Sequence, residues 1–168
     1  MTLPDRFKLA VITLSDRAYW GEYKDTSGPA VAKYLRYVMA SAGWSYEMKT
    51  MIVPDDASRL REVLSSILTD YDLIVTTGGT GLGPRDITVD VIKPMLTKEI
   101  PGIMELIRVT CGSKNPGALL SRSIAGVIGK TLVYTLPGSE KAVHEYMSEI
   151  VKTIEHSFYM LYGIDKHK

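Results

Sequence analysis

The segment Leu73–Gly83 reads LIVTTGGTGLG, and it places a short apolar run directly before four glycines. The run Leu73–Thr77 is rich in Ile, Val and Thr, which is typical of a buried β-strand. Glycines that follow such a strand let the backbone turn sharply and approach a ligand closely. We therefore predict a strand that ends in a ligand-binding loop.

Strand and helix patterns alternate on the N-terminal side of this junction. Phe7–Leu14 and Ser45–Val53 are predicted strands, and each is followed by a helix with its apolar residues on one face. This order favours an α/β fold with a mostly parallel sheet and helices on both of its faces. Right-handed crossovers then bring the loops that begin at Ser15, Pro54 and Gly78 to one edge of the sheet, where such folds bind ligands.

The second half of the chain is less regular. Thr88–Leu96 and Ile103–Thr110 are predicted helices, and Ile124–Ile128 and Thr131–Leu136 are predicted strands. Only Gly129-Lys130 separates these two strands, which predicts an antiparallel hairpin. A long amphipathic helix follows. Because no repeat or linker interrupts the chain, we expect residues 1–168 to form a single domain.

Composition excludes several classes of protein. The chain has 168 residues, with 20 Lys and Arg against 19 Asp and Glu, and a formal net charge of +1. This balance gives no reason to expect nucleic acid or a membrane surface as partner. The single cysteine, Cys111, cannot form an internal disulfide. No apolar run approaches the roughly 20 residues of a membrane span, and the polar start is not a secretory signal. We therefore expect a cytoplasmic protein.

Thr76–Asp86 has the residues of a phosphate-binding loop. Successive amides in a glycine-rich turn converge on phosphate oxygens, threonine hydroxyls add donors, and Arg85 adds a fixed positive charge. Thr88 is expected to cap the next helix. The loop lacks the Gly-Lys-Ser/Thr ending of a P-loop and the G-x-G-x-x-G spacing of a dinucleotide site, so kinase-type and hydride-transfer functions gain no support. The alternative is a connection that only lets strand and helix pack.

Two aspartates that follow predicted strands are the candidate catalytic residues. Asp86 ends the glycine loop and Asp55 follows the second strand, so both are expected at the ligand edge. There they could hold Mg²⁺ against phosphates, or one of them could position or deprotonate a reacting group. Simpler uses stay open, because Asp55 or Asp56 could cap the helix that begins near Ala57, and Asp86 could stabilise a helix N-terminus.

A third polar cluster, Ser121-Arg122-Ser123, lies between apolar segments. Two hydroxyls beside a guanidinium could recognise a phosphate or a polar ring. Pro137-Gly138 is interpreted either as a turn or as a close approach of backbone to ligand. His144, His156 and His167 have no partner at metal-ligand spacing, so they are expected to be surface or packing residues.

Taken in order, these motifs resemble those of the molybdopterin adenylyltransferase family, which comprises the bacterial Mog proteins and the gephyrin-type G domains of eukaryotes, with MoaB as a close relative. The match covers nearly all of the chain. Its most specific parts are Thr77–Gly81 and Pro84–Thr88. The supporting parts are Ser15-Asp16-Arg17, Gly21–Asp25, Val53–Asp56, Leu120–Ser123 and Leu136–Gly138.

The resemblance implies a mixed sheet in a three-layer α/β/α sandwich, a homotrimer, and an enzyme of molybdenum cofactor biosynthesis. In the implied reaction the terminal phosphate of molybdopterin attacks the α-phosphorus of ATP, assisted by Mg²⁺. Adenylylated molybdopterin and pyrophosphate are the products. Molybdate insertion by a partner protein follows, so a transient contact with such a protein is expected.

The resemblance also assigns residues. Asp55 and Asp86 match aspartates that are essential to the chemistry, and we expect them to be the catalytic residues and the Mg²⁺ ligands. Ser121 matches a serine in the pterin and phosphate region. The predicted substrate-binding residues are Ser15, Asp16, Thr77, Gly78, Gly79, Thr80, Gly81, Arg85, Ser121, Arg122, Ser123, Pro137 and Gly138.

The chain departs from the family pattern at a few positions. Tyr19 and Trp20 stand where small polar residues are commoner, and their rings are expected either to line the ligand pocket or to pack against a neighbouring subunit. Val89 replaces a usual proline after Thr88.

Three rival functions follow from related proteins. A MoaB-like protein would bind molybdopterin without adenylylating it, a relative of the competence-damage proteins would be a nucleotide pyrophosphatase, and a gephyrin-like protein would serve as a scaffold. Because both Asp55 and Asp86 are present, the enzyme is favoured over the binder.

Overall fold

A computed structural model describes residues 2–165, and His167 lies outside this range. The strands are β1 (Phe7–Leu14), β2 (Tyr46–Val53), β3 (Leu73–Thr77), β4 (Lys98–Glu99), β5 (Ala125–Ile128) and β6 (Thr131–Leu136). They form one sheet in the order β2-β1-β3-β6-β5-β4. The four strands from β2 to β6 in this order are parallel, whereas β5 runs antiparallel to both of its neighbours.

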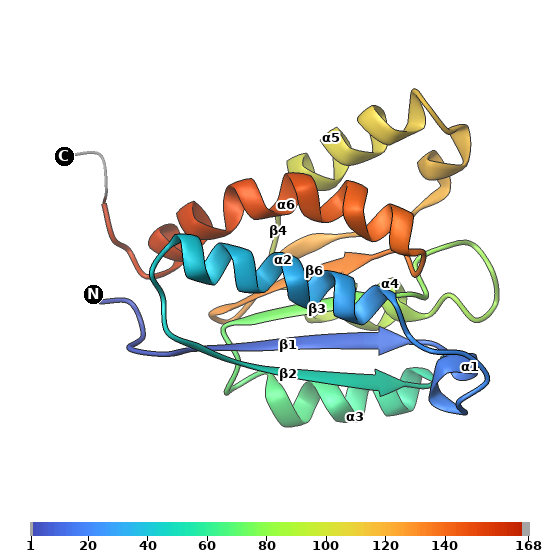
Figure 1. Ribbon diagram of the computed structural model, residues 1–168, viewed down its shortest axis with the longest axis horizontal. Helices are drawn as coiled ribbons and strands as arrows, with labels where there is room; N and C mark the ends of the chain where they lie inside the picture. Colours follow the sequence, from blue (N-terminus) through green and yellow to red (C-terminus); the bar gives the residue numbers. More distant parts are fainter. Residues whose placement is uncertain (1, 166–168) are drawn as a thin grey trace.

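Helices cover both faces of the sheet (Figure 1). They are α1 (Asp16–Tyr19), α2 (Ser27–Ser41), α3 (Ala57–Ile67), α4 (Thr88–Ile92), α5 (Pro101–Gly112) and α6 (Glu140–Leu161), with the 3₁₀ turns η1 (Lys93–Met95) and η2 (Pro116–Leu120). One apolar cluster joins α2, α5 and α6 to one face, and a second joins α3 and α4 to the other. The expected three-layer α/β/α sandwich around a mixed sheet is therefore confirmed. Within residues 2–165 no helix combines the length and the apolar character needed to cross a membrane.

The residues 9–12 of strand β1 are all apolar because helices cover both faces of the sheet at this strand. Leu9 and Val11 belong to the cluster beneath α2 and α6, whereas Ala10 and Ile12 belong to the cluster beneath α3. All four side chains are at most 1% exposed. A central parallel strand with helices on both faces buries successive residues, so it shows no polar alternation.

The predicted hairpin of β5 and β6 is confirmed. The two strands are joined by Gly129-Lys130, and Gly129 has a φ of +61°. A positive φ at the first central residue is what a type II′ hairpin turn requires, and glycine adopts it without steric cost.

The predicted helix Thr88–Leu96 starts where expected but ends too late. Helix α4 stops at Ile92 and continues as the turn η1, because Pro94 has no N–H to donate and disfavours a continued α-helix. Thr88 is not the cap. It is the first helical residue, and its hydroxyl donates to the carbonyl of Gly78 at 2.8 Å. The next predicted helix is longer than expected, since α5 runs from Pro101 to Gly112.

Three short elements were not predicted. Strand β4 consists of two exposed residues. Its flanks pair mainly through backbone, as when Ile100 N–H donates to the carbonyl of Ala125 at 2.8 Å, although the Thr97 hydroxyl also donates to the Val127 carbonyl. Helix α1 and the turn η2 are only four and five residues long. Segments of this length carry no readable apolar period.

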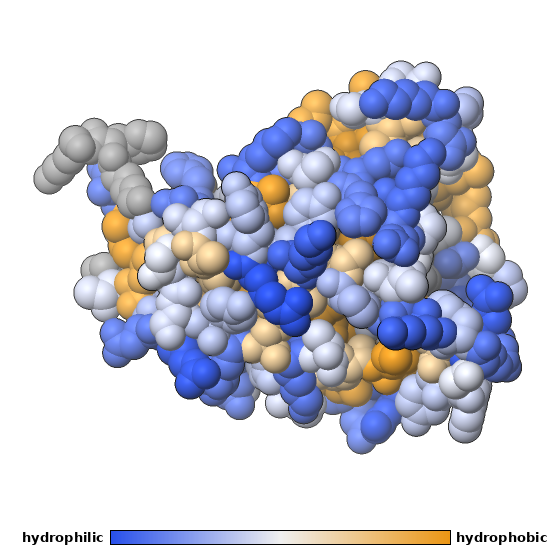
Figure 2. Space-filling model, in the orientation of Figure 1, coloured by the Kyte–Doolittle hydropathy of each residue, from blue (hydrophilic) through white to orange (hydrophobic). Residues whose placement is uncertain are grey.

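Apolar side chains are exposed on α5 and η2. Figure 2 shows a mostly hydrophilic face with apolar atoms along its upper right edge, in the region of α5 and η2. The exposed apolar side chains of these two elements are Leu106, Val109, Leu119 and Leu120.

Gly78 lies very close to the neighbouring strand β1. It directly follows β3, has a φ of +100°, and lies so close to β1 that a Cβ would overlap the carbonyl oxygen of Leu14. Gly129 also has a positive φ, but no atom lies within 4 Å of the position that its Cβ would take. Substitution of Gly129 therefore tests the cost of a positive φ alone. Substitution of Gly78 tests that cost together with the cost of steric overlap.

We expect Gly129→Ala to lower the free energy of unfolding by about 1–2 kcal/mol, because only the left-handed backbone is penalised. Gly78→Ala should lose a further ~1–3 kcal/mol from overpacking against Leu14. Urea unfolding of the two variants measures the difference. Equal losses would contradict the close approach at Gly78.

Candidate functional site

The candidate site lies at the carboxyl ends of the four parallel strands. The residues that follow β1, β2, β3 and β6 are Ser15, Pro54, Gly78 and Pro137. Their strands are neighbours in the sheet and share one direction. The first crossover leads from β1 to β2, and the second leads from β2 to β3 on the other side of β1, so the strand order reverses beside β1. Ligands of open α/β sheets bind at such a switch point.

Hydrogen bonds tie the end of β3 to the end of β6. The Thr77 hydroxyl donates to the Pro137 carbonyl at 2.9 Å, and the Gly78 N–H donates to the Leu136 carbonyl at 2.9 Å. Thr77 is fully buried. The prediction that the Gly78 amide binds phosphate is therefore wrong, because that amide is already used within the protein.

The amides of the next three residues are not used in this way within the part of the chain that the structure describes. Gly79, Thr80 and Gly81 donate no backbone hydrogen bond to any acceptor within residues 2–165. The carbonyl of Gly79 accepts from Thr88 N–H at 3.0 Å, which fixes the turn. A fixed glycine-rich turn with undonated N–H groups has the form of an anion-binding nest.

Asp86 folds back under this loop. Its Oδ2 accepts a hydrogen bond from Gly83 N–H at 2.8 Å. A Cβ on Gly81 would lie 2.9 Å from the same oxygen, and one on Gly83 would lie 3.0 Å from it. Both glycines therefore leave room for the carboxylate.

The structure separates the roles of Asp55 and Asp56. Asp56 caps α3, with Oδ1 accepting from Arg59 N–H at 2.7 Å. Asp55 instead exchanges hydrogen bonds with Asp16: its N–H donates to Asp16 Oδ1 at 2.9 Å, and its Oδ2 accepts from Asp16 N–H at 3.1 Å. Asp55 is thus left at the site and is not used as a cap.

Asp55 and Asp86 influence each other electrostatically. Burial raises the pKa of the Asp55 carboxyl above its ordinary value of 3.8, and the negative charge of Asp86 raises this pKa further. The two carboxylates are therefore close enough to repel, as the parallel sheet predicted.

Arg85 and Ser15 are engaged with neighbouring residues. The guanidinium of Arg85 forms an ion pair with Asp16, although 68% of its side chain is exposed. The Ser15 hydroxyl caps α1 by accepting from Ala18 N–H at 3.3 Å, and it lies 3.1 Å from the Tyr23 hydroxyl. The exposed Arg85 side chain can reach an anionic ligand, whereas the Asp16 side chain of the pair is only 19% exposed.

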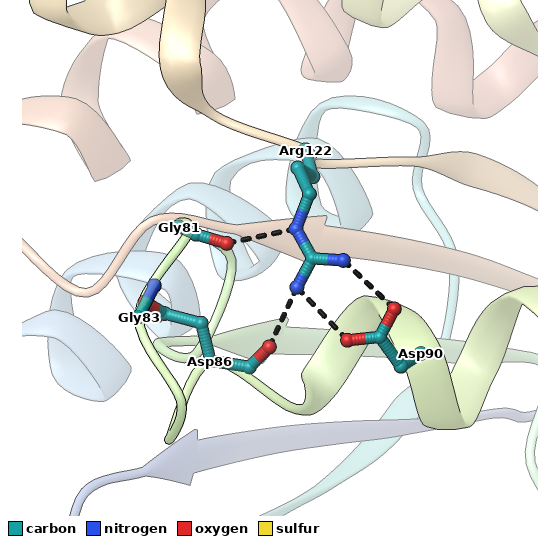
Figure 3. Close-up of polar contacts among 5 residues, drawn as sticks. All are labelled: Gly81, Gly83, Asp86, Asp90 and Arg122. Atoms are coloured by element: carbon teal, nitrogen blue, oxygen red, sulfur yellow. Dashed lines mark hydrogen bonds and ion pairs between the residues drawn. The ribbon is translucent and has the colours of Figure 1, made fainter.

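The three residues of the Ser121-Arg122-Ser123 cluster have different surroundings in the structure. Ser121 and Ser123 lie with their hydroxyls 3.0 Å apart, but Ser123 is only 1% exposed. The Arg122 guanidinium donates to the carbonyls of Gly81 and Asp86 and to the carboxylate of Asp90 (Figure 3). Its donors therefore hold the protein together at this site.

Two cavities share this edge, and both are lined by Gly79, Asp86, Gly138 and Ser139. The larger measures about 580 Å³, and the predicted residues that line it are Ser15, Asp55, Gly78, Gly79, Arg85, Asp86 and Gly138. The smaller measures about 340 Å³, and the predicted residues that line it are Gly79, Thr80, Gly81, Asp86, Ser121, Pro137 and Gly138. Asp16, Thr77, Arg122 and Ser123 line neither cavity.

Sequence reasoning missed several lining residues. Tyr23 and Arg17 line the larger cavity, and Asn115, Lys141 and Tyr146 line the smaller one. Tyr23 could have been found, since it lies in the Gly21–Asp25 motif. Arg17 could have been found in the same way, since it lies in the Ser15-Asp16-Arg17 motif. Asn115, Lys141 and Tyr146 carry no such signal, because they reach the smaller cavity only through the placement of α6 and the α5–η2 loop. Tyr19 and Trp20 line neither cavity, and they are 44% and 72% exposed.

The carboxylates fit a magnesium site that is completed by the ligand. Within residues 2–165, Oδ1 of Asp55 and Oδ1 of Asp86 accept no hydrogen bond. The same part of the chain offers no group of three His, Cys, Asp or Glu side chains that could hold a metal by itself. Mg²⁺ commonly binds through one or two carboxylates together with phosphate oxygens and water.

Comparison with known proteins shows the family of the chain. Residues 10–156 match the model of a family described as the probable molybdopterin binding domain. The chain belongs to this family. Within it, the molybdopterin adenylyltransferase of Helicobacter pylori strain J99 is 36% identical over 158 residues, which span 92% of this chain and 88% of that protein. Molybdenum cofactor biosynthesis protein B of Staphylococcus aureus strain MRSA252 is 34% identical over 147 residues, or 86% of this chain and 85% of that protein.

Gephyrin of Dictyostelium discoideum matches only in part. It is 37% identical over 155 residues, which span 89% of this chain but 22% of gephyrin. The chain thus corresponds to one portion of that longer protein.

Solved structures of related proteins have the same fold. The molybdopterin biosynthesis enzyme MoaB of Thermus thermophilus is 36% identical with a TM-score of 0.78, over 94% of this chain and 97% of that one. A MogA structure is 31% identical with a TM-score of 0.81, over 92% of this chain and 99% of that one. The CinA protein of Thermoplasma acidophilum has a TM-score of 0.62 at 20% identity, which is a likeness of fold alone.

The raised pKa of Asp55 predicts the pH dependence of stability. A carboxyl whose pKa is higher in the folded state destabilises the fold once it ionises, so stability is lost as pH rises through that pKa. We expect Asp55→Asn to raise the midpoint of thermal unfolding at pH 7, by no more than about 4 °C. The gain should vanish below the ordinary pKa of 3.8.

Asp56→Asn is the matched control. Hydrogen bonds from Ser58 and Arg59 lower the pKa of Asp56, so its charge stabilises the fold at neutral pH. This variant should be no more stable than the wild type at pH 7. A lower midpoint for Asp55→Asn at pH 7 would contradict the repulsion between Asp55 and Asp86.

Proposed function

We propose that this protein is a molybdopterin adenylyltransferase, which transfers AMP from ATP to the terminal phosphate of molybdopterin. The observation that carries the proposal is the pair Asp55 and Asp86, two mutually repelling carboxylates beside the undonated amides of residues 79–81. Two carboxylates that repel each other are stabilised by a bound cation, and amides that donate to no protein acceptor can bind an anion. Substrate phosphates with bound Mg²⁺ supply both. The two Helicobacter pylori proteins of this name, at 36% and 35% identity over 92% of this chain, support the same reaction.

In this proposal the two cavities hold the two substrates. ATP occupies the larger cavity, where Asp55 and Arg85 face its phosphates. Molybdopterin occupies the smaller cavity, where Ser121, Asn115 and Lys141 offer polar groups to the pterin and its phosphate. The reacting phosphates then meet at Asp86, which lines both cavities.

The chemistry follows from this placement. A terminal phosphate oxygen of molybdopterin attacks the α-phosphorus of ATP, the bond from that phosphorus to the bridging α–β oxygen breaks, and pyrophosphate leaves with the electron pair. The attacking oxygen is already anionic, so no base is needed and acceleration comes mainly from positioning. The amides of Gly79–Gly81 orient the phosphates, and Arg85 exchanges Asp16 for the leaving group. When bound at Asp55 and Asp86, Mg²⁺ offsets the phosphate charge.

The same proposal extends to partners. A homotrimer is expected from the resemblance to the family, and the exposed apolar side chains of α5 and η2 (Figure 2) form a surface that subunit contact would bury. Molybdate insertion then follows through transient contact with an insertion protein.

The test is pyrophosphate release from ATP by the purified protein with Mg²⁺, with and without molybdopterin. We expect release that requires molybdopterin, and an Asp86→Asn variant slowed about 10²–10³-fold because an electrostatic contact to the reacting phosphates is lost. Asp70→Asn is the control, since Asp70 is exposed and precedes β3 at the opposite edge of the sheet.

Two outcomes would contradict the proposal. Molybdopterin binding without pyrophosphate release would make the protein a carrier of the kind its resemblance to MoaB allows. Turnover of ATP without molybdopterin would make it a nucleotide pyrophosphatase.

A further inference from the structure

Arg122 reaches from the segment after η2 across to the glycine loop and α4 (Figure 3). Its backbone N–H donates to the Thr80 carbonyl at 2.8 Å. Its Nε donates to the Gly81 carbonyl at 2.8 Å, and its Nη2 donates to the Asp86 carbonyl at 2.6 Å. The outer edge of the guanidinium meets the Asp90 carboxylate, with Nη1 at 2.7 Å from Oδ1 and Nη2 at 2.9 Å from Oδ2.

These contacts fix both ends of the segment 81–86. The carbonyls of Gly81 and Asp86 accept from one planar guanidinium, so their separation is set by a rigid group. The Asp86 carboxylate is fixed in turn, because it accepts from Gly83 N–H inside the same segment. The place of this carboxylate between the two cavities therefore depends on a residue that lines neither of them.

Asp90 completes the contact. It lies in the first turn of α4, and the hydrogen bond from Arg122 lowers the pKa of its carboxyl. A bidentate pair of this kind fixes the plane of the guanidinium as well as its position. It also pairs the Arg122 charge with the Asp90 carboxylate.

We propose that Arg122 is a positioning residue, which acts with Asp90 through the carbonyls of Gly81 and Asp86 to hold the Asp86 carboxylate between the two cavities. This inference rests on the proposed function and deepens it. It replaces the expectation that the Arg122 guanidinium itself binds substrate.

Kinetics of Arg122→Lys and Asp90→Asn test the proposal. Lysine keeps the charge but loses the planar fork, and asparagine keeps the shape but loses the charge. We expect each variant to lower kcat for pyrophosphate release about 10–100-fold through misplacement of Asp86. The KM values for ATP and molybdopterin should change less than about threefold. The double variant should be no slower than the slower single variant, because both break one unit.

Direct substrate binding would give another pattern. In that case Arg122→Lys would raise the KM for molybdopterin, and Asp90→Asn would leave kcat unchanged, which would overturn the proposal. Arg6→Lys is the control, because it alters an exposed ion pair with Glu47 at the opposite end of β1.

Hydrogen exchange tests the same proposal without substrate. Peptides that cover residues 80–87 should exchange faster in Arg122→Lys and Asp90→Asn than in the wild type, whereas peptides of β3 and α6 should not change. Unchanged exchange over residues 80–87 would overturn the proposal. Since this measurement needs no turnover, it decides the role of Arg122 even if the wild type releases no pyrophosphate and the proposed function fails.

Discussion

The site depends on the contact between Gly78 and the end of β1. A side chain at Gly78 would overlap the Leu14 carbonyl, while the N–H of Gly78 donates to Leu136 at the end of β6. The chain after β3 is therefore held between two neighbouring strand ends. This constraint lets the loops after β1, β3 and β6 meet, because a loop that left β3 at another angle would not place Asp86 beside either cavity.

The carboxylates of the site are held by backbone groups more than by cations. Asp55 is placed by its exchange of hydrogen bonds with Asp16, and Asp86 by Gly83 N–H and by Arg122 through its carbonyl. Neither carboxylate forms an ion pair within residues 2–165. Their repulsion, which contributes to the raised pKa of Asp55, is a cost that the fold tolerates. Carboxylates kept close without a cation are typical of a site that acts on a charged ligand.

The apolar patterns of the sequence predicted most of the fold. The hydrogen bonds of the polar groups at the site could not be predicted in the same way. The buried strands β1 and β3 and the hairpin of β5 and β6 follow from periodicity and glycine chemistry. The strand β4 does not, because two exposed residues that pair through backbone leave no pattern.

At the site, sequence could name Asp55 and Asp86 but could not decide between Asp55 and Asp56 as the cap of α3. That choice depends on where β2 ends relative to α1, since Asp16 engages Asp55. The use of the Gly78 amide and the inward direction of Arg122 are likewise set by contacts between segments far apart in the chain. Hydrogen bonds of this kind are tertiary and have no local sequence signal.

The central claim is that two substrates bind side by side and meet at Asp86. The most direct measurement is calorimetric titration of the protein with the Mg²⁺ complex of α,β-methylene-ATP, which cannot release pyrophosphate, in the absence and presence of saturating molybdopterin. The account predicts one nucleotide site per chain in both conditions, because the cavities are separate. An apparent Kd that rises in proportion to the molybdopterin concentration would show competition for a single site and would contradict the account.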